Sequence, residues 1–182
     1  MKVKTKTLAK QSRVYRKLHR FIAIPFVTFM LLLGVTGLLL TWKDQLQLKP
    51  NTQKSIANNS TLISLDIIKN NAINHIKDLN LSADINRIDY RPRKGIAKVR
   101  FENHFTELQI DCYSGQIISE KQRTADIIEM IHDGSILDYL FKNQSNPIKL
   151  LYSTMTSLAL ILLSFSGFWL WLKPRQIKKL KQ

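Results

Sequence analysis

The chain has 182 residues and carries 28 Lys or Arg against 13 Asp or Glu, a formal net charge of +15. All 13 acids lie between two long apolar runs, whereas the tails outside those runs hold 13 basic residues and no acid. Basic residues beside apolar runs orient a membrane protein and meet anionic lipid, so the charge does not indicate nucleic-acid binding. The single cysteine, Cys112, excludes an internal disulfide and a Cys-x-x-Cys metal site, and we expect it to be a small buried residue rather than a reactive thiol.

Two segments, residues 21–42 and 150–172, contain no Asp, Glu, Lys, Arg or His. Helices of that length rise about 33–35 Å, which is enough to cross a bilayer, and a spanning segment must satisfy its backbone polar groups internally. A cleaved signal peptide is the alternative for the first segment, but its apolar region would be only about 7–15 residues long. We therefore predict an integral membrane α-helical hairpin of two transmembrane helices.

The basic tails, residues 1–20 and 173–182, predict the orientation of this hairpin. Short flanking segments rich in Lys and Arg remain cytoplasmic. Both termini are then expected in the cytoplasm, with residues 43–149 outside the cytoplasmic (inner) membrane. Within the first tail, Ser12 can cap a helix that runs into the first span.

Small residues lie on one face of each predicted transmembrane helix. They are Gly34, Gly37, Ser153, Ser157, Ser164 and Gly167. Small side chains let helix backbones approach closely in lipid. These faces are predicted to pack the two helices against each other in antiparallel orientation, and homodimerisation is the alternative use of the same faces.

The region between the spans is expected to form an extracytoplasmic domain. Residues 43–60 are polar, include the run Asn-Asn-Ser at 58–60, and are typical of a linker. In residues 61–122, Ser64 can cap a helix with apolar residues at helical spacing, and alternating apolar residues then predict a meander of short strands, the last at 116–119. One helix on one face of an antiparallel sheet is a small α+β fold.

Residues 123–149 mix apolar residues with acids and are interrupted by Asp-Gly-Ser at 133–135. This pattern predicts two short amphipathic helices at the outer membrane interface. Five residues of the segment make a polar cluster that could bind a cation: Asp126, Glu129, His132, Asp133 and Asp138. They lack a metal-ligand spacing such as His-Glu-x-x-His, so helix solvation explains them, and we expect neither a catalytic residue nor a metal site.

Several motifs together resemble one known family. Residues 107–118, Glu-Leu-Gln-Ile-Asp-Cys-Tyr-Ser-Gly-Gln-Ile-Ile, resemble the closing strand pair of the PepSY domain, with Ser114 where Thr is usual. Arg-Lys-Leu-His-Arg at 16–20, followed by Gly-Val-Thr-Gly at 34–37, resembles the first helix of PepSY-associated transmembrane proteins. Ile-His-Asp-Gly ahead of Ser-Gly-Phe-Trp-Leu-Trp resembles their closing segment. In this order the motifs extend from about residue 13 to 175.

The resemblance implies a minimal two-span member of that family with a PepSY-like outer domain. Larger members have more transmembrane helices, and some are implicated in iron and siderophore reduction through haem held by histidines. By the same resemblance, His19 and His132 occupy the family's histidine positions, whereas His75 and His104 match none. We expect His104, in a hairpin turn, to be solvated.

The predicted topology limits how the two family-like histidines can bind haem. His19 precedes the first span and His132 the second, so about 30 Å of hydrocarbon separates them. A six-coordinate haem b needs two axial ligands at one depth. Haem would therefore require a homodimer, a single axial ligand or a partner subunit, and the alternative role for each histidine is that of an interfacial residue.

These observations lead us to expect a membrane-anchored, non-enzymatic interaction or regulatory module. It would act outside the cytoplasmic membrane through a membrane-protein partner or as a homodimer. The alternative is a haem-binding electron-transfer subunit of a ferric or siderophore reductase system, with His19 and His132 as ligands.

Overall fold

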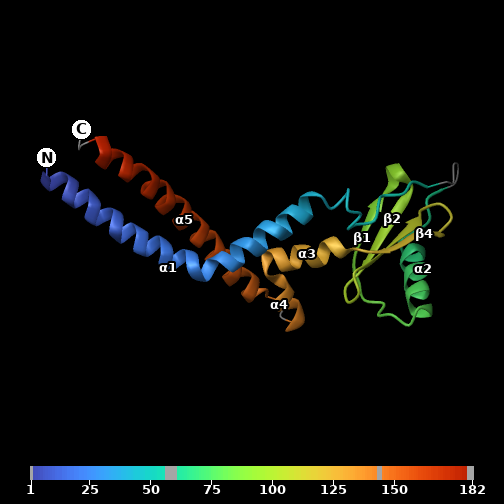
Figure 1. The fold of residues 1–182 in the computed structure, drawn as a ribbon. Helices are drawn as coiled ribbons and strands as arrows, with labels where there is room; N and C mark the ends of the chain where they lie inside the picture. The colour runs from blue at the N-terminus through green and yellow to red at the C-terminus, as the bar shows by residue number, and fades with distance from the viewer. Residues whose placement is uncertain (1, 56–60, 143–144, 180–182) are drawn as a thin grey trace. The chain divides into compact units, whose positions relative to one another are not determined.

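A computed structural model describes residues 2–55, 61–142 and 145–179, so the run at 58–60 lies outside the described residues. Two compact units make up the chain (Figure 1): a helical unit, Met1–Gly37 with Met130–Gln182, and a sheet unit, Leu38–Glu129. The predicted fold elements are present as two long apolar helices and a central four-stranded antiparallel sheet with helices.

The two long helices are α1, Lys2–Thr41, and α5, Pro147–Lys179. Helix α1 already begins in the basic tail, because Lys, Gln, Arg and Leu are good helix formers. Ser12 consequently lies inside the helix, and the prediction that it caps the helix was wrong.

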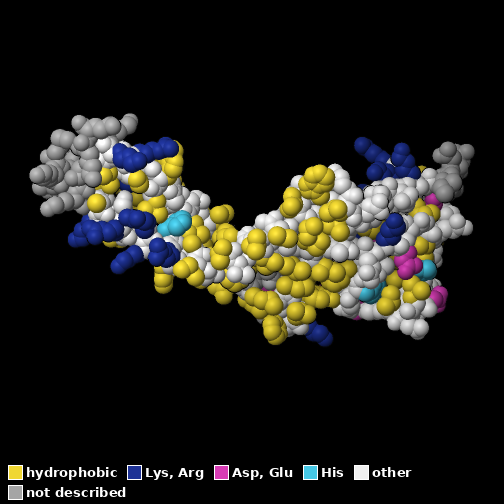
Figure 2. Space-filling view, in the orientation of Figure 1, with side chains coloured by type: hydrophobic (Ala, Val, Ile, Leu, Met, Phe, Trp, Pro, Cys, Tyr) yellow, Lys and Arg dark blue, Asp and Glu magenta, His cyan; other side chains and the backbone are white. Residues whose placement is uncertain are grey.

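Both long helices leave most of their apolar side chains exposed. Only 6% of the most hydrophobic window of α1 and 17% of that of α5 are buried, whereas the core helix of a soluble protein would be mostly buried. Figure 2 shows hydrophobic side chains over the visible surface of the helical unit, with Lys and Arg gathered near the chain ends. This surface requires a lipid or protein environment.

Two short helices precede α5, as predicted: α3, Thr124–Asp133, and α4, Ser135–Leu140. Gly134 separates them at φ 82°, where a Cβ would also come within 2.5 Å of the Tyr152 ring. Glycine adopts this left-handed conformation without steric cost. In α4, the buried carboxylate of Asp138 accepts hydrogen bonds from the backbone N–H groups of Ile148 and Lys149 and so stabilises the start of α5.

The sheet unit contains α2, Leu65–Asp78, followed by four strands. These are β1 Ile85–Arg91, β2 Ile96–Phe101, β3 Thr106–Asp111 and β4 Ile117–Gln122, with a short 3-10 helix, η1 Pro92–Lys94, after β1. They pair in the order β1-β2-β3-β4, which confirms the meander. Strand β4 extends beyond the expected 116–119 because polar Lys121 and Gln122 continue the pairing with β3.

One face of the sheet packs against α2. Ser64 caps α2, as expected, by accepting a hydrogen bond from the Ile67 N–H. The buried cluster consists of Ile68, Ala72, Ile76, Ala97, Val99, Phe101, Leu108, Ile110 and Cys112. Alternate residues of β2 and β3 point into this cluster, which is why the period of two in the sequence predicted the buried face.

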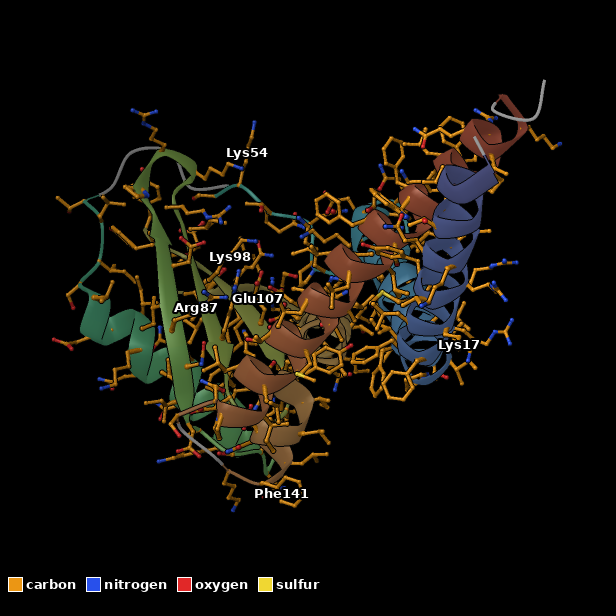
Figure 3. All side chains as sticks on the ribbon, turned by 90° about the vertical axis from the view of Figure 1, so that its left-hand side faces the viewer. Lys17, Lys54, Arg87, Lys98, Glu107 and Phe141 are labelled. Atoms are coloured by element: carbon orange, nitrogen blue, oxygen red, sulfur yellow. The ribbon has the colours of Figure 1, made fainter. Side chains whose placement is uncertain are left out.

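The opposite face of the sheet carries buried polar groups. Glu107 is fully buried and forms ion pairs with Lys98 at 3.1 Å, Arg100 at 3.2 Å and Arg123 at 2.7 Å. Figure 3 shows Lys98 and Glu107 near each other on the sheet. Burial lowers the pKa of Lys98, although its hydrogen bond to Glu107 opposes that shift.

Part of the segment expected to be a linker crosses this polar face. The Gln53 N–H donates to Gln109 Oε1 at 2.8 Å, and Gln109 Nε2 donates to the Asn51 carbonyl at 2.9 Å. Ser55 donates to the Asp111 carboxylate through its hydroxyl. Residues 51–55 are therefore part of the sheet unit and supply partners for its buried polar side chains.

Candidate functional site

His19 of α1 lies against α5 within the helical unit. Its Nδ1 is 2.8 Å from the hydroxyl of Ser166. A Cβ added to the next residue, Gly167, would lie 3.6 Å from His19 Cε1, so the ring packs directly on the helix backbone. In this arrangement a histidine ring hydrogen-bonds to a Ser or Thr hydroxyl and packs on the glycine that follows it. We call it a histidine seat.

His132 of α3 occupies a second histidine seat on α1. Its Nδ1 is 2.8 Å from Thr36 Oγ1, and a Cβ added to Gly37 would lie 3.5 Å from His132 Cε1. Thr36 and Ser166 are 5% and 6% exposed, so both seats are set into the helical unit. Each seat thus joins two segments that are far apart in the sequence.

The hydroxyl groups fix the tautomer of both rings. Thr36 Oγ1 is 2.6 Å from the Leu32 carbonyl, and Ser166 Oγ is 2.6 Å from the Leu162 carbonyl. A carbonyl only accepts hydrogen bonds, so each hydroxyl gives its one proton to the backbone. Each hydroxyl must then accept from the histidine, which places a proton on Nδ1, so the lone pair of the neutral ring lies on Nε2.

Neither Nε2 atom has a hydrogen-bond partner among the residues that the structure describes. Both histidines are half-buried. A neutral imidazole whose Nδ1–H is held by a hydrogen bond is oriented to bind a metal through Nε2. The donor chemistry of both seats therefore suits an axial ligand of haem iron.

The two seats are related by an internal similarity in the sequence. Residues 31–40, Leu-Leu-Leu-Gly-Val-Thr-Gly-Leu-Leu-Leu, align with residues 161–170, Ile-Leu-Leu-Ser-Phe-Ser-Gly-Phe-Trp-Leu, and the two stretches have the same pattern of exposure. This alignment equates Thr36 with Ser166. Sequence reasoning did not identify these two residues as histidine partners, although the repeated hydroxyl-glycine pair was the signal for them.

The small residues that were predicted to pack the helices lie in different surroundings. Besides Gly37 and Gly167, which hold the histidine rings, Ser153 donates to the Asp133 carbonyl at 3.1 Å. In contrast, Gly34, Ser157 and Ser164 are exposed, and a Cβ at Gly34 would meet nothing within 4 Å.

The remaining two histidines belong to the sheet unit. His75 Nε2 is 2.8 Å from Glu120 Oε2. The expectation that His104 is solvated was wrong, because its ring stacks on Phe101 and its nitrogens contact Thr106 Oγ1 and the Ser82 carbonyl. The turn between β2 and β3 thus brings the His104 ring into contact with Phe101 and Ser82.

The acidic residues around His132 are engaged separately. Asp126 pairs with Arg123 and Asp133 pairs with Lys149, while Asp138 binds the first backbone N–H groups of α5. Burial raises the pKa of Asp133, but hydrogen bonds from Lys149 and Ser135 outweigh this effect and bring the pKa below its ordinary value. Across residues 2–55, 61–142 and 145–179, no group of three or more His, Cys, Asp or Glu is arranged to hold a metal ion.

Comparison with known families adds one match. The family model described as the PepSY-associated TM region matches residues 16–181, a range that includes both histidine seats and the sheet. A search of curated proteins finds no match to this chain.

Proposed function

Because the chain belongs to the family of PepSY-associated TM regions, we propose that it spans the bacterial cytoplasmic membrane twice and carries the sheet unit outside. The tails of 13 basic residues and no acid support cytoplasmic termini. Reporter fusions at residue 182 and within 56–60 test this orientation. Cytoplasmic activity only at the first site and extracytoplasmic activity only at the second are expected, and the reverse pattern would reject it.

The function that the histidine seats support best is haem binding between two copies of the chain, for electron transfer. The observation that carries this proposal is the pair of Nε2 atoms without a partner among the described residues, each on a ring oriented by a hydroxyl group. A haem bound there would supply one-electron redox chemistry. Ser166 and Thr36 would hold the ligand rings in place.

A second copy would supply the second axial ligand, because one chain offers a single histidine at each depth. His19 is 17 residues before Thr36, the partner of His132, which corresponds to about 25 Å along α1. Both histidines of one chain therefore cannot bind one iron. A two-fold axis would bring each histidine opposite its own copy. The exposed Gly34, Ser157 and Ser164 offer small residues for that helix contact.

The absorption spectrum of the full-length protein, purified in detergent after expression with haem supply, tests this function. We expect a Soret band that weakens in His19→Ala and in His132→Ala and is lost in the double variant. His75→Ala is the matched control, because His75 lies in the sheet unit and pairs with Glu120. A wild-type protein without a Soret band would remove the proposal.

A second candidate is a non-enzymatic module that acts on another membrane protein. It is favoured by the apolar surface of the helical unit, where side chains such as Leu31, Val35 and Phe165 are 68%, 50% and 73% exposed. A photo-crosslinker at residue 157 distinguishes the candidates. A crosslinked dimer of this chain supports the shared haem site, whereas a crosslink to one different protein, together with no Soret band, supports the interaction module.

A further inference from the structure

A cleft of about 490 Å³ lies between α1 and α5 at the end of the helical unit that holds both chain termini. Its volume falls within the about 300–1,000 Å³ typical of small-molecule sites. The walls are largely apolar and come from Ala9 of α1 and from Leu170, Pro174 and Ile177 of α5. Within the described part of the chain no histidine lines this cleft, so it is distinct from both histidine seats.

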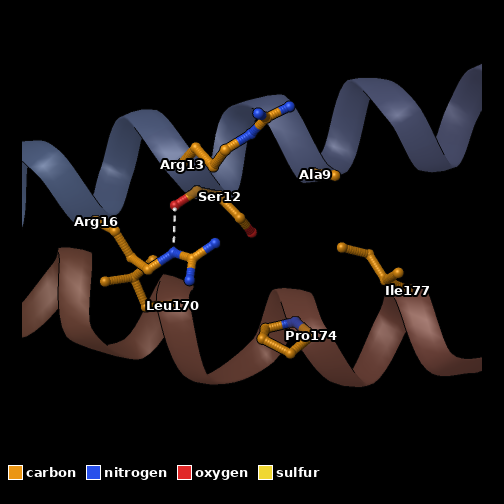
Figure 4. Close-up of a pocket in the computed structure, with 7 residues that line it drawn as sticks. All are labelled: Ala9, Ser12, Arg13, Arg16, Leu170, Pro174 and Ile177. Atoms are coloured by element: carbon orange, nitrogen blue, oxygen red, sulfur yellow. Dashed lines mark hydrogen bonds between the residues drawn. The ribbon is translucent and has the colours of Figure 1, made fainter.

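The polar lining of the cleft comes from Ser12, Arg13 and Arg16 of α1. Figure 4 shows the Ser12 hydroxyl and the Arg16 guanidinium on the side of α1 that faces α5, whereas Arg13 lies on the other side. Arg16 uses its Nε to donate to the Ser12 carbonyl at 3.4 Å. Its two terminal nitrogens have no partner among the described residues.

Ser12 differs from the other buried hydroxyl residues of the long helices. Thr36, Thr156 and Ser166 all donate to the carbonyl four residues earlier in their own helix. Ser12 is only 6% exposed, yet its Oγ has no hydrogen-bond partner in residues 2–55, 61–142 and 145–179. A buried hydroxyl without a partner costs free energy. The cleft therefore lacks a hydrogen-bond acceptor for the Ser12 hydroxyl.

The missing acceptor is not an acidic side chain of this end of the molecule. Neither tail contains an acidic side chain, and the acid nearest to Arg16 in the sequence is Asp44. Helix α5 also carries a basic side chain at this end: Lys173 Nζ lies 4.1 Å from the centre of the Trp169 ring. The ligand that fits is therefore an anion with acceptor oxygens that also carries apolar chains.

We propose that this cleft binds one anionic phospholipid of the leaflet at which both chain ends lie. The phosphate accepts hydrogen bonds from the Ser12 hydroxyl and from the terminal nitrogens of Arg16. The acyl chains leave the cleft past Leu170 towards the apolar run at 150–172, Pro174 and Ile177 flank the headgroup, and Arg13 adds positive charge at the rim. A free phosphate ion would satisfy the polar groups but would leave this apolar wall uncovered.

Native mass spectrometry of the full-length protein tests the proposal. The delipidated protein is mixed with phosphatidylglycerol or with zwitterionic phosphatidylcholine. We expect one retained phosphatidylglycerol per chain and at least about tenfold weaker retention in Arg16→Gln, a factor equivalent to about 1.4 kcal/mol. Lys17→Gln is the matched control, since it removes the same charge from an exposed neighbour outside the cleft and should change retention less than about twofold.

Two further variants distinguish a lipid site in the cleft from a general effect of charge or folding. Leu170→Trp fills the cleft without changing charge and should also reduce retention, so the proposal stays testable if Arg16→Gln fails to fold. His75→Ala should retain the lipid, because His75 lies in the sheet unit and does not line the cleft. Equal losses in Arg16→Gln and Lys17→Gln, equal retention of both lipids, displacement by inorganic phosphate, or loss of lipid in His75→Ala would each overturn the proposal.

Discussion

The sheet unit and the helical unit keep their folds by different means. The sheet unit buries a continuous apolar cluster between α2 and one face of the sheet, and pairs its buried charges on the other face. The helical unit leaves most of its apolar surface exposed and places its specific contacts at a few polar points, above all Thr36 and Ser166. The first unit therefore carries its own core, whereas the second depends on its surroundings for stability and on hydrogen bonds for register.

Removing the central anion of the polar face should have the largest effect on the sheet unit. Glu107→Gln leaves Lys98, Arg100 and Arg123 without their shared carboxylate, and we expect a loss of about 3–5 kcal/mol of stability. Hydrogen exchange of the β2 and β3 amides in the full-length protein measures it. Glu102→Gln, at an exposed position, is the control, and equal effects of the two variants would contradict the role of the buried network.

Truncating the apolar cluster should have the next largest effect. Ile76 is fully buried, so Ile76→Ala is expected to cost about 2–5 kcal/mol. Ile67 lies on the same helix but is 47% exposed, and Ile67→Ala should change stability by no more than about 0.5 kcal/mol. Chemical denaturation followed by β-sheet circular dichroism checks both values. If the two variants were equally destabilising, α2 would not pack as described.

Removing the hydroxyl group of a histidine seat should destabilise the protein less than either substitution above. Ser166→Ala removes the acceptor for His19 Nδ1–H, and we expect a cost of about 0.5–1.5 kcal/mol to the helical unit. Nitrogen NMR shifts of His19 should then report a mixture of tautomers in place of one. Ser164→Ala is the matched control because Ser164 bonds only to its own helix at Leu160 within the described residues, and it should leave the His19 signals unchanged.

The smallest effect concerns the single thiol. Burial raises the pKa of Cys112 to about 11, so the thiol stays protonated in the folded sheet unit. The folded state then holds this proton more tightly than the unfolded state, and stability falls as the pH rises from about 9 towards 11. We expect slow maleimide labelling at pH 8 that becomes fast on denaturation. Rapid labelling of the folded protein would show that Cys112 is accessible.

Local signals were enough to predict most of the sheet unit. Ser64 caps α2, and the alternation through Val99 and Ile110 identified the face that α2 covers. The same alternation places Glu107 and Gln109 on the opposite face, but it does not say what covers them. Residues 51–55 complete that face through contacts with residues more than 50 positions away, which no local pattern encodes.

The candidate site was predictable only in part. The resemblance singled out His19 and His132, but not the residues that orient them. Their partners Ser166 and Thr36 lie 147 and 96 positions away, and which residue meets which depends on the register of the packed helices. Ser12 was misplaced for a related reason, because helix propensity in the tail extends α1 past the residue that resembled a cap.

The sequence by itself determined the class of the protein. Apolar runs free of charged residues, basic tails without acids and a change of period from helix to strand set the two long helices and the small α+β unit, because these features act over one or two turns or strands. Only the tertiary structure decided the chemistry of the site. It turned two ordinary hydroxyl groups into acceptors that set the histidine tautomers, and it left a third buried hydroxyl, that of Ser12, without a partner among the described residues. Hydrogen bonds are short-ranged and directional, so these roles exist only once the helices are packed.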